Sequence, residues 1–179
     1  PLWVMMTGLL QADGRTYAGD LYQVSGPAFN AQPFIPITAA NLVKVGAMPL
    51  TFSSARTATL SSTYQGAAVS KDIVPQVFGT AAASCSATTG SRAGLTNYQD
   101  MWWNPAESGW GVNIVHQNST LFATLITYDL AGSNLWLVMS AGLPQPDGSY
   151  LGDLHRVSGP AFNAQPFTPI TGANLAQVG

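Results

Sequence analysis

The chain has 179 residues, enough for one domain or two small ones, and 46% of them are hydrophobic, which suffices for a packed core. Only 8% are charged, the net charge is −2, and the six Lys and Arg residues are scattered along the chain. Because nucleic-acid-binding proteins gather basic residues in a stripe or patch, this composition argues against a nucleic-acid partner. The apolar runs all fall short of about 18 residues, so we expect no transmembrane helix.

The N-terminal residues alternate short apolar runs with turn residues, which is typical of β-strands. We predict a buried strand in residues 1–6 and a returning strand in residues 16–24. Asp13-Gly14 lies between them and is a strong hairpin-turn signal. The chain therefore begins with an antiparallel pair.

Residues 25–37 hold three prolines and one glycine. Each proline lacks the N–H group that a central strand needs, so a regular strand is excluded. We predict an ordered, extended connection pinned by Phe29 and Phe34, followed by a single helical turn that Thr38 caps. This stretch is called the first connector below.

Three further strands are predicted before a change in composition. Residues 48–53 and 58–64 alternate apolar and polar side chains, and residues 69–78 gather Ile, Val and Phe. Residues 80–97 are rich in Ser, Ala, Thr and Gly and lack periodicity, which predicts a linker. Cys85 lies in this linker, and it is either an unpaired or buried small residue or a bridge to another chain or to a part of the protein outside this sequence.

The second half opens with the tryptophan-rich stretch YQDMWWNPAESGWG. Short turns then separate apolar runs that lack the 3.6-residue period of a helix. Strands on which both faces are apolar usually have a core on one side and a neighbour on the other. The predicted strands of this region are residues 110–117, 120–129 and 135–143.

One segment occurs twice in the chain. VSGPAFNAQPF stands at Val24–Phe34 and again, unchanged, at Val157–Phe167, inside longer matching stretches. We call residues 157–170 the second connector. The repetition predicts one full repeat plus part of another, with the chain starting and ending inside a repeat.

Counting strands over one period gives about seven, joined by short turns. This predicts an all-β fold, an antiparallel meander forming a small barrel or barrel-like sandwich. We expect three segments: 1–79 as the C-terminal part of one repeat, 80–97 as a linker, and 98–179 as the N-terminal part of the next repeat.

Several stretches resemble a known family: WWNPAESGWGVNI, TLFATLITYD, LWLVMSAG, GPAFNA, LTFSSARTATLS and VPQVF. In this order they are similar to a β-domain found singly or in tandem in secreted and surface proteins of proteobacteria. The resemblance implies an exported β-domain of uncharacterised function, and it supplies no catalytic or binding residues. Family members carry Lys or Thr-Arg before the final QVF, whereas this chain has Val74-Pro75, which indicates an edge strand.

The tryptophan-rich stretch is the candidate ligand-binding site. Aromatic rings beside amides and a carboxylate can stack on sugar rings and bind hydroxyls, as in a lectin. The alternative is that the same residues fill the barrel and tie down the loop. The candidate residues are Trp102, Trp103, Asn104, Glu107 and Trp110.

Catalysis and metal binding have little support. A triad of His116, Glu107 and a serine can be drawn, but no GxSxG elbow is present. The two histidines and one cysteine show no metal-ligand spacing. We therefore predict no enzyme activity, no catalytic residues, no metal site and no cofactor.

The two partial repeats lack different strands, so each is expected to supply what the other needs. We hypothesise an extracellular or cell-surface bacterial protein, structural or adhesive, whose copies join head to tail into a fibre by strand complementation. The competing arrangement is a longer tandem array in which every barrel closes within one chain. The runner-up function is a carbohydrate-binding module with surface glycans as partners.

Overall fold

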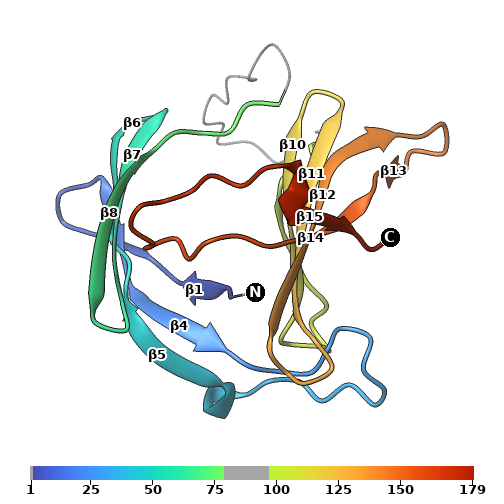
Figure 1. Cartoon of the computed structure of the whole chain (residues 1–179), viewed down its shortest axis with the longest axis horizontal. Coiled ribbons are helices and arrows are strands. Elements are labelled where there is room, and N and C mark those ends of the chain that lie inside the picture. The colour runs from blue at the N-terminus through green and yellow to red at the C-terminus, as the bar shows by residue number, and fades with distance from the viewer. Residues whose placement is uncertain (1, 79–96) are drawn as a thin grey trace.

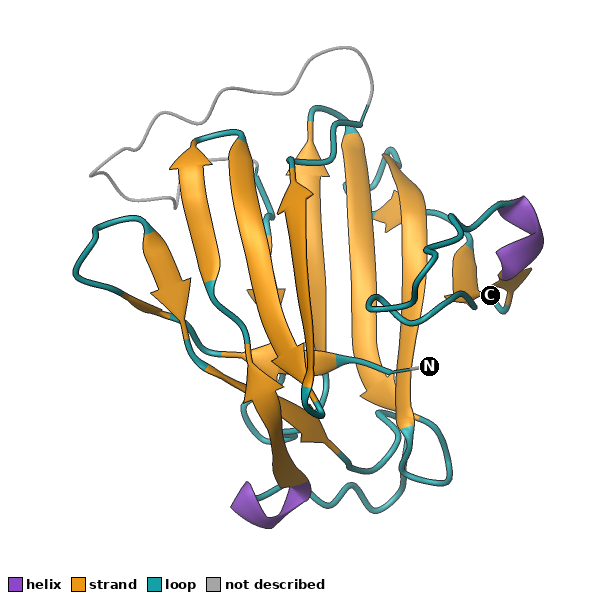
Figure 2. Ribbon diagram, turned by 60° about the vertical axis from the view of Figure 1, so that its left-hand side comes forward, coloured by secondary structure: helices purple, strands orange, loops and turns teal. Residues whose placement is uncertain are grey.

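Short apolar runs separated by Gly, Pro, Asn and Asp form strands throughout the computed structural model, which describes residues 2–78 and 97–179. The fold is all-β and antiparallel, as predicted. Two sheets lie opposite each other, one strongly curled, so that the molecule is barrel-like (Figures 1 and 2). Helical structure in the described ranges is limited to the 3-10 turns η1 (Ala39–Asn41) and η3 (Gly172–Asn174).

The N-terminal sheet has eight strands, with the order β1-β4-β5-β7-β6-β3-β2 and β8 paired with β7. The strands are β1 (Val4–Met6), β2 (Leu9–Leu10), β3 (Thr16–Ala18), β4 (Asp20–Val24), β5 (Leu42–Ala47), β6 (Leu50–Ser54), β7 (Thr57–Tyr64) and β8 (Ala67–Ile73).

The C-terminal sheet has seven strands, with the order β15-β14-β12-β11-β10-β9 and β13 paired with β12. The strands are β9 (Asp100–Trp102), β10 (Gly111–Gln117), β11 (Thr120–Tyr128), β12 (Asn134–Pro144), β13 (Tyr150–Leu151), β14 (Leu154–Val157) and β15 (Leu175–Gln177).

Strand β5 was not predicted, because Lys44 and Gly46 interrupt the apolar pattern of residues 42–47. It forms because β4 pairs with it along its length, Gln23 opposite Val43. Gly46 is required at the point where β5 meets β7, since a Cβ there would overlap the carbonyl oxygen of Thr63. Strand β7 thus pairs with β5, β6 and β8, and the N-terminal sheet is not a simple meander.

Two other boundaries differ from the prediction. The strand expected in residues 69–78 is β8 and ends at Ile73, two residues before Pro75, which has no N–H to donate. Residues 100–102, for which no strand was predicted, form β9 and pair with β10. Most of the predicted linker, with Cys85, lies outside the described residues.

The duplicated stretches share their pairing register. Met5 on β1 lies opposite Tyr22 on β4, and Val138 on β12 lies opposite His155 on β14. The predicted turn at Asp13-Gly14 is confirmed, because the Gln11 N–H donates to the Thr16 carbonyl at 2.8 Å and β2 pairs with β3 across it. Hydrogen bonds from Thr16 and Arg15 also hold the pKa of the Asp13 carboxyl at about 2. The same sequence therefore directs the same local structure in both halves.

Equivalent residues of the two duplicated stretches differ in how deeply they are buried. Leu21 on β4 is 0% exposed and Val24 is buried, whereas Leu154 and Val157 on β14 are only half-buried. The difference is the opposite on the strands that precede them, β1 and β12. There the residue of the second copy, Val138, is buried, whereas its counterpart in the first copy, Met5, is 44% exposed. Each half thus exposes a surface that the other half buries.

No helix within residues 2–78 and 97–179 has the length and apolar character needed to cross a bilayer.

We predict that Leu21→Ala lowers the free energy of unfolding by about 2–5 kcal/mol, because it leaves a cavity in the best-packed part of the core. Leu154→Ala at the equivalent, half-buried position should cost clearly less. Urea denaturation followed by tryptophan fluorescence measures both. Equal losses would show that the two copies are equally buried in solution.

Candidate functional site

The tryptophan-rich stretch divides into two parts. Trp102 ends β9 and Trp103 follows it, and their side chains are 50% and 56% exposed. The indole N–H of Trp102 donates to the carbonyl oxygen of Tyr98 at 2.9 Å. These two rings therefore form an exposed aromatic edge.

The other three candidates hold the loop in shape. The Asn104 side-chain oxygen accepts the Ala106 N–H at 3.0 Å, and its carbonyl accepts the Glu107 N–H at 3.0 Å. The indole N–H of Trp110 donates to Glu107 Oε2 at 3.0 Å. Among the described residues, Asn104 and Glu107 thus have structural partners within their own loop.

The same loop contacts the first connector, which reaches it from the N-terminal sheet. The Trp110 ring lies 6.2 Å from the Phe29 ring, tilted by 58°. Two residues before Trp110, the Ser108 carbonyl accepts the Ile37 N–H at 2.9 Å. The middle and the C-terminal end of the connector are therefore fixed to the C-terminal half.

The end of β11 and the start of β12 complete this contact. Thr127 Oγ1 accepts the N–H of Phe29 at 3.0 Å, and the Asn134 side-chain amide donates to the Val24 carbonyl oxygen. We call the surface formed by these groups the acceptor surface. Its residues are Ser108, Trp110, Thr127, Tyr128 and Asn134.

Tyr128 is the floor of the acceptor surface. It is 1% exposed, and a Cβ at Gly26 would lie 2.5 Å from its Cε2 atom. Ala28 is 6% exposed, so a charged side chain at this position would be buried. Trp3 covers the other side of the Tyr128 ring, and the centroids of the two rings are 5.4 Å apart. The indole N–H of Trp3 donates to the Thr127 carbonyl oxygen.

This arrangement holds an extended segment of the same chain. Two polar side chains and one carbonyl bind main-chain groups of the first connector, and Gly26 and Ala28 pack closely at its centre. A catalytic use has no support in these contacts. Within the described residues, His, Cys, Asp and Glu form no group of three that could hold a metal ion.

Sequence reasoning found Trp110 but missed Thr127, Tyr128 and Asn134. These residues flank the turn between β11 and β12, where a Thr-Tyr-Asp run looks like an ordinary strand end. The duplicated connector was a signal that a binding segment is present. It carried no information about which surface receives it.

Comparisons with protein-family models, curated proteins and solved structures returned no match to this chain. The site is therefore interpreted from its own residues.

Tyr128 has an unusual chemical environment. Its hydroxyl is buried and has no hydrogen-bond partner among the described residues. Burial raises the pKa of the hydroxyl from its ordinary value near 10 to about 12. The folded state thus favours the neutral phenol, so its contribution to stability is complete below pH 10 and is lost as the pH rises through 12.

We predict that Tyr128→Phe keeps or raises stability at pH 7 by up to about 1 kcal/mol, because it removes an unsatisfied buried hydroxyl. It should also reduce the loss of stability between pH 10 and 12. Urea denaturation across this range tests both effects, with Tyr17→Phe as the control at a 41% exposed tyrosine. A clear loss of stability at pH 7 would mean that the hydroxyl has a partner.

Proposed function

We propose that this chain is an extracellular structural or adhesive β-repeat protein whose copies join head to tail. In this arrangement, surfaces that one copy leaves open are covered by the equivalent strands and connector of the next. The extracellular location rests on the low charge and on the resemblance to domains of secreted and surface proteins.

Exposed apolar side chains on both sheets support association. They include Met5 on β1, which is 44% exposed, and Leu143 on β12, which is 54% exposed. Exposed apolar surface is a common feature of proteins that are covered by a partner.

The observation that carries the proposal is the reciprocal burial of the duplicated stretches. Strand β12 pairs with β11 on one side and β14 on the other, whereas its counterpart β1 pairs with β4 alone among the described strands. The connector shows the opposite preference at two positions, since Val24 and Ala28 are buried in the first copy whereas Val157 is half-buried and Ala161 is exposed in the second. One copy of the chain therefore presents a free strand edge and a free connector, which suits head-to-tail contact.

We predict that the sedimentation coefficient of the chain increases with concentration and that electron micrographs of concentrated material show filaments. Met5→Lys should reduce association, because a lysine on an edge strand opposes strand addition. Leu130→Lys is the matched control, since Leu130 is 92% exposed in a turn.

A wild-type chain that sediments as a monomer up to its solubility limit would contradict the proposal. It would favour the alternative in which each barrel closes within one longer chain. Equal loss of association in both lysine variants would mean that added charge, and not the β1 edge, is responsible.

Carbohydrate binding is the second candidate, favoured by the half-exposed rings of Trp102 and Trp103. Adjacent exposed tryptophans can stack on sugar rings. We predict that any binding on a glycan array is lost in the Trp102→Ala/Trp103→Ala double variant and persists in Leu130→Ala. Binding that survives the double variant would exclude this edge as the sugar site.

A further inference from the structure

The two connectors are chemically the same ligand, yet only the first is seated on an acceptor surface. Residues 24–34 and 157–167 are identical, and Ile37 has its counterpart in Ile170. Ala28 is 6% exposed on the acceptor surface, whereas Ala161 is exposed.

The shape of the connector does not depend on being seated. The Ala31 N–H binds the Ala28 carbonyl at 2.9 Å in the first copy, and Ala164 and Ala161 repeat this bond at 2.9 Å in the second. Gly26 also lies against Ile37 as Gly159 lies against Ile170. A Cβ added at either glycine would be 2.7 Å from the isoleucine of its own copy. The second connector is thus already in the conformation that the acceptor surface binds, so seating it requires little further ordering.

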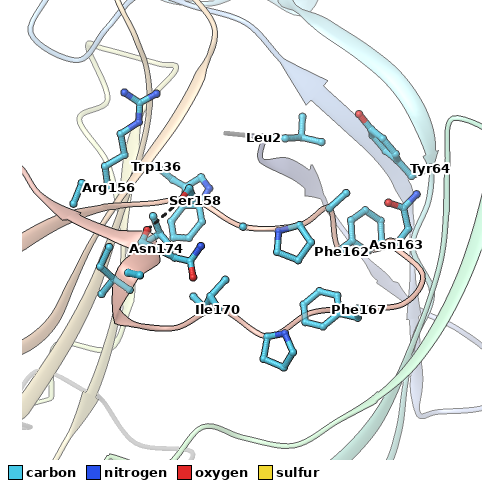
Figure 3. Close-up of a pocket in the computed structure, with 18 residues that line it drawn as sticks. Leu2, Tyr64, Trp136, Arg156, Ser158, Phe162, Asn163, Phe167, Ile170 and Asn174 are labelled. Atoms are coloured by element: carbon cyan, nitrogen blue, oxygen red, sulfur yellow. Dashed lines mark hydrogen bonds between the residues drawn. The ribbon is translucent and has the colours of Figure 1, made fainter.

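The second connector is partly exposed where it lies, with Phe167 45% and Ile170 48% exposed. It crosses from the C-terminal sheet to the N-terminal one, where the Phe162 ring stands 6.0 Å from the Tyr64 ring (Figure 3). Lys71 Nζ lies 4.3 Å from the Phe167 ring centroid. A cavity of about 1050 Å³ runs along it, lined by Leu2 and Trp136 as well as by connector residues. These contacts leave its apolar side chains incompletely packed.

We propose that the second connector docks on the acceptor surface of another copy of this chain, in the place that the first connector of that copy occupies. This rests on the proposed head-to-tail assembly and identifies its contact. The docked Phe162 N–H would bind Thr127 Oγ1, the Val157 carbonyl would accept from Asn134, and Gly159 would lie against Tyr128. The two connectors then compete for one acceptor surface.

The test uses position 161, which is exposed within one copy but would be buried in the docked state. Ala161→Arg should weaken self-association by about 100-fold or more, since it would bury an unpaired charge. Gln165→Arg is the matched control, because Gln165 and its counterpart Gln32 are both exposed, and it should leave association unchanged. Sedimentation equilibrium measures both variants, and self-association that survives Ala161→Arg would overturn the inference.

A second measurement separates this inference from the assembly on which it rests. A fluorescent peptide with the sequence of residues 157–170 should bind the wild-type chain weakly and the Ala28→Arg chain at least about tenfold more tightly, because expelling the first connector frees the acceptor surface. The same peptide carrying Ala161→Arg should not bind either chain. Circular dichroism checks that the Ala28→Arg chain remains folded. If it is unfolded, the replacement test uses the wild-type chain, whose oligomers should dissociate when excess peptide is added.

The outcomes are distinct. Specific peptide binding without self-association of the wild-type chain would support the recognition and overturn the head-to-tail assembly. Self-association without peptide binding, and insensitive to Ala161→Arg, would overturn the recognition while the assembly stands.

Discussion

The close approach of Gly26 to Tyr128 is the contact on which the joining of the two sheets depends. Only a residue without a Cβ leaves space for the tyrosine ring, and the ring can then be buried between the first connector and Trp3. The hydroxyl of Tyr128 lacks a partner in the described chain, so the tyrosine itself contributes to this junction by packing. The polar groups around it fix the register of the connector instead.

The connector therefore acts as a small rigid body. Its internal hydrogen bonds and its closing 3-10 turn recur in both copies, with the Thr38 and Thr171 backbones within a few degrees of each other. A segment that keeps its shape in two environments owes that shape to its own sequence. The difference in burial between the copies then reflects the availability of an acceptor surface and no difference in the segment itself.

Much of this fold follows from local sequence signals. The turn at Asp13-Gly14, the extended connector and the helical turn after Thr38 all depend on side chains within a few residues, and the predictions for them are confirmed. Strand β5 was missed because its Lys44 and Gly46 make sense only beside β4 and β7. The acceptor surface was missed for the same reason, since Thr127 and Tyr128 gain their role from a connector about a hundred residues away.

In the proposed assembly, the first and second connectors compete for one acceptor surface. The energies of their contacts alone do not determine which of them binds. The seated contacts would be the same for both, so the balance would be set by the effective concentration of each connector at the surface. The first connector has the advantage that Trp3, on the same sheet, is bound to Thr127 and Tyr128 at the same time. A connector from another copy gains its own advantage only when a second contact forms alongside it, and the unpaired edge of β1 is the place where that contact is available. Docking of the connector and pairing of the strand edge would then reinforce each other, which is the condition for extended assembly from individually weak contacts.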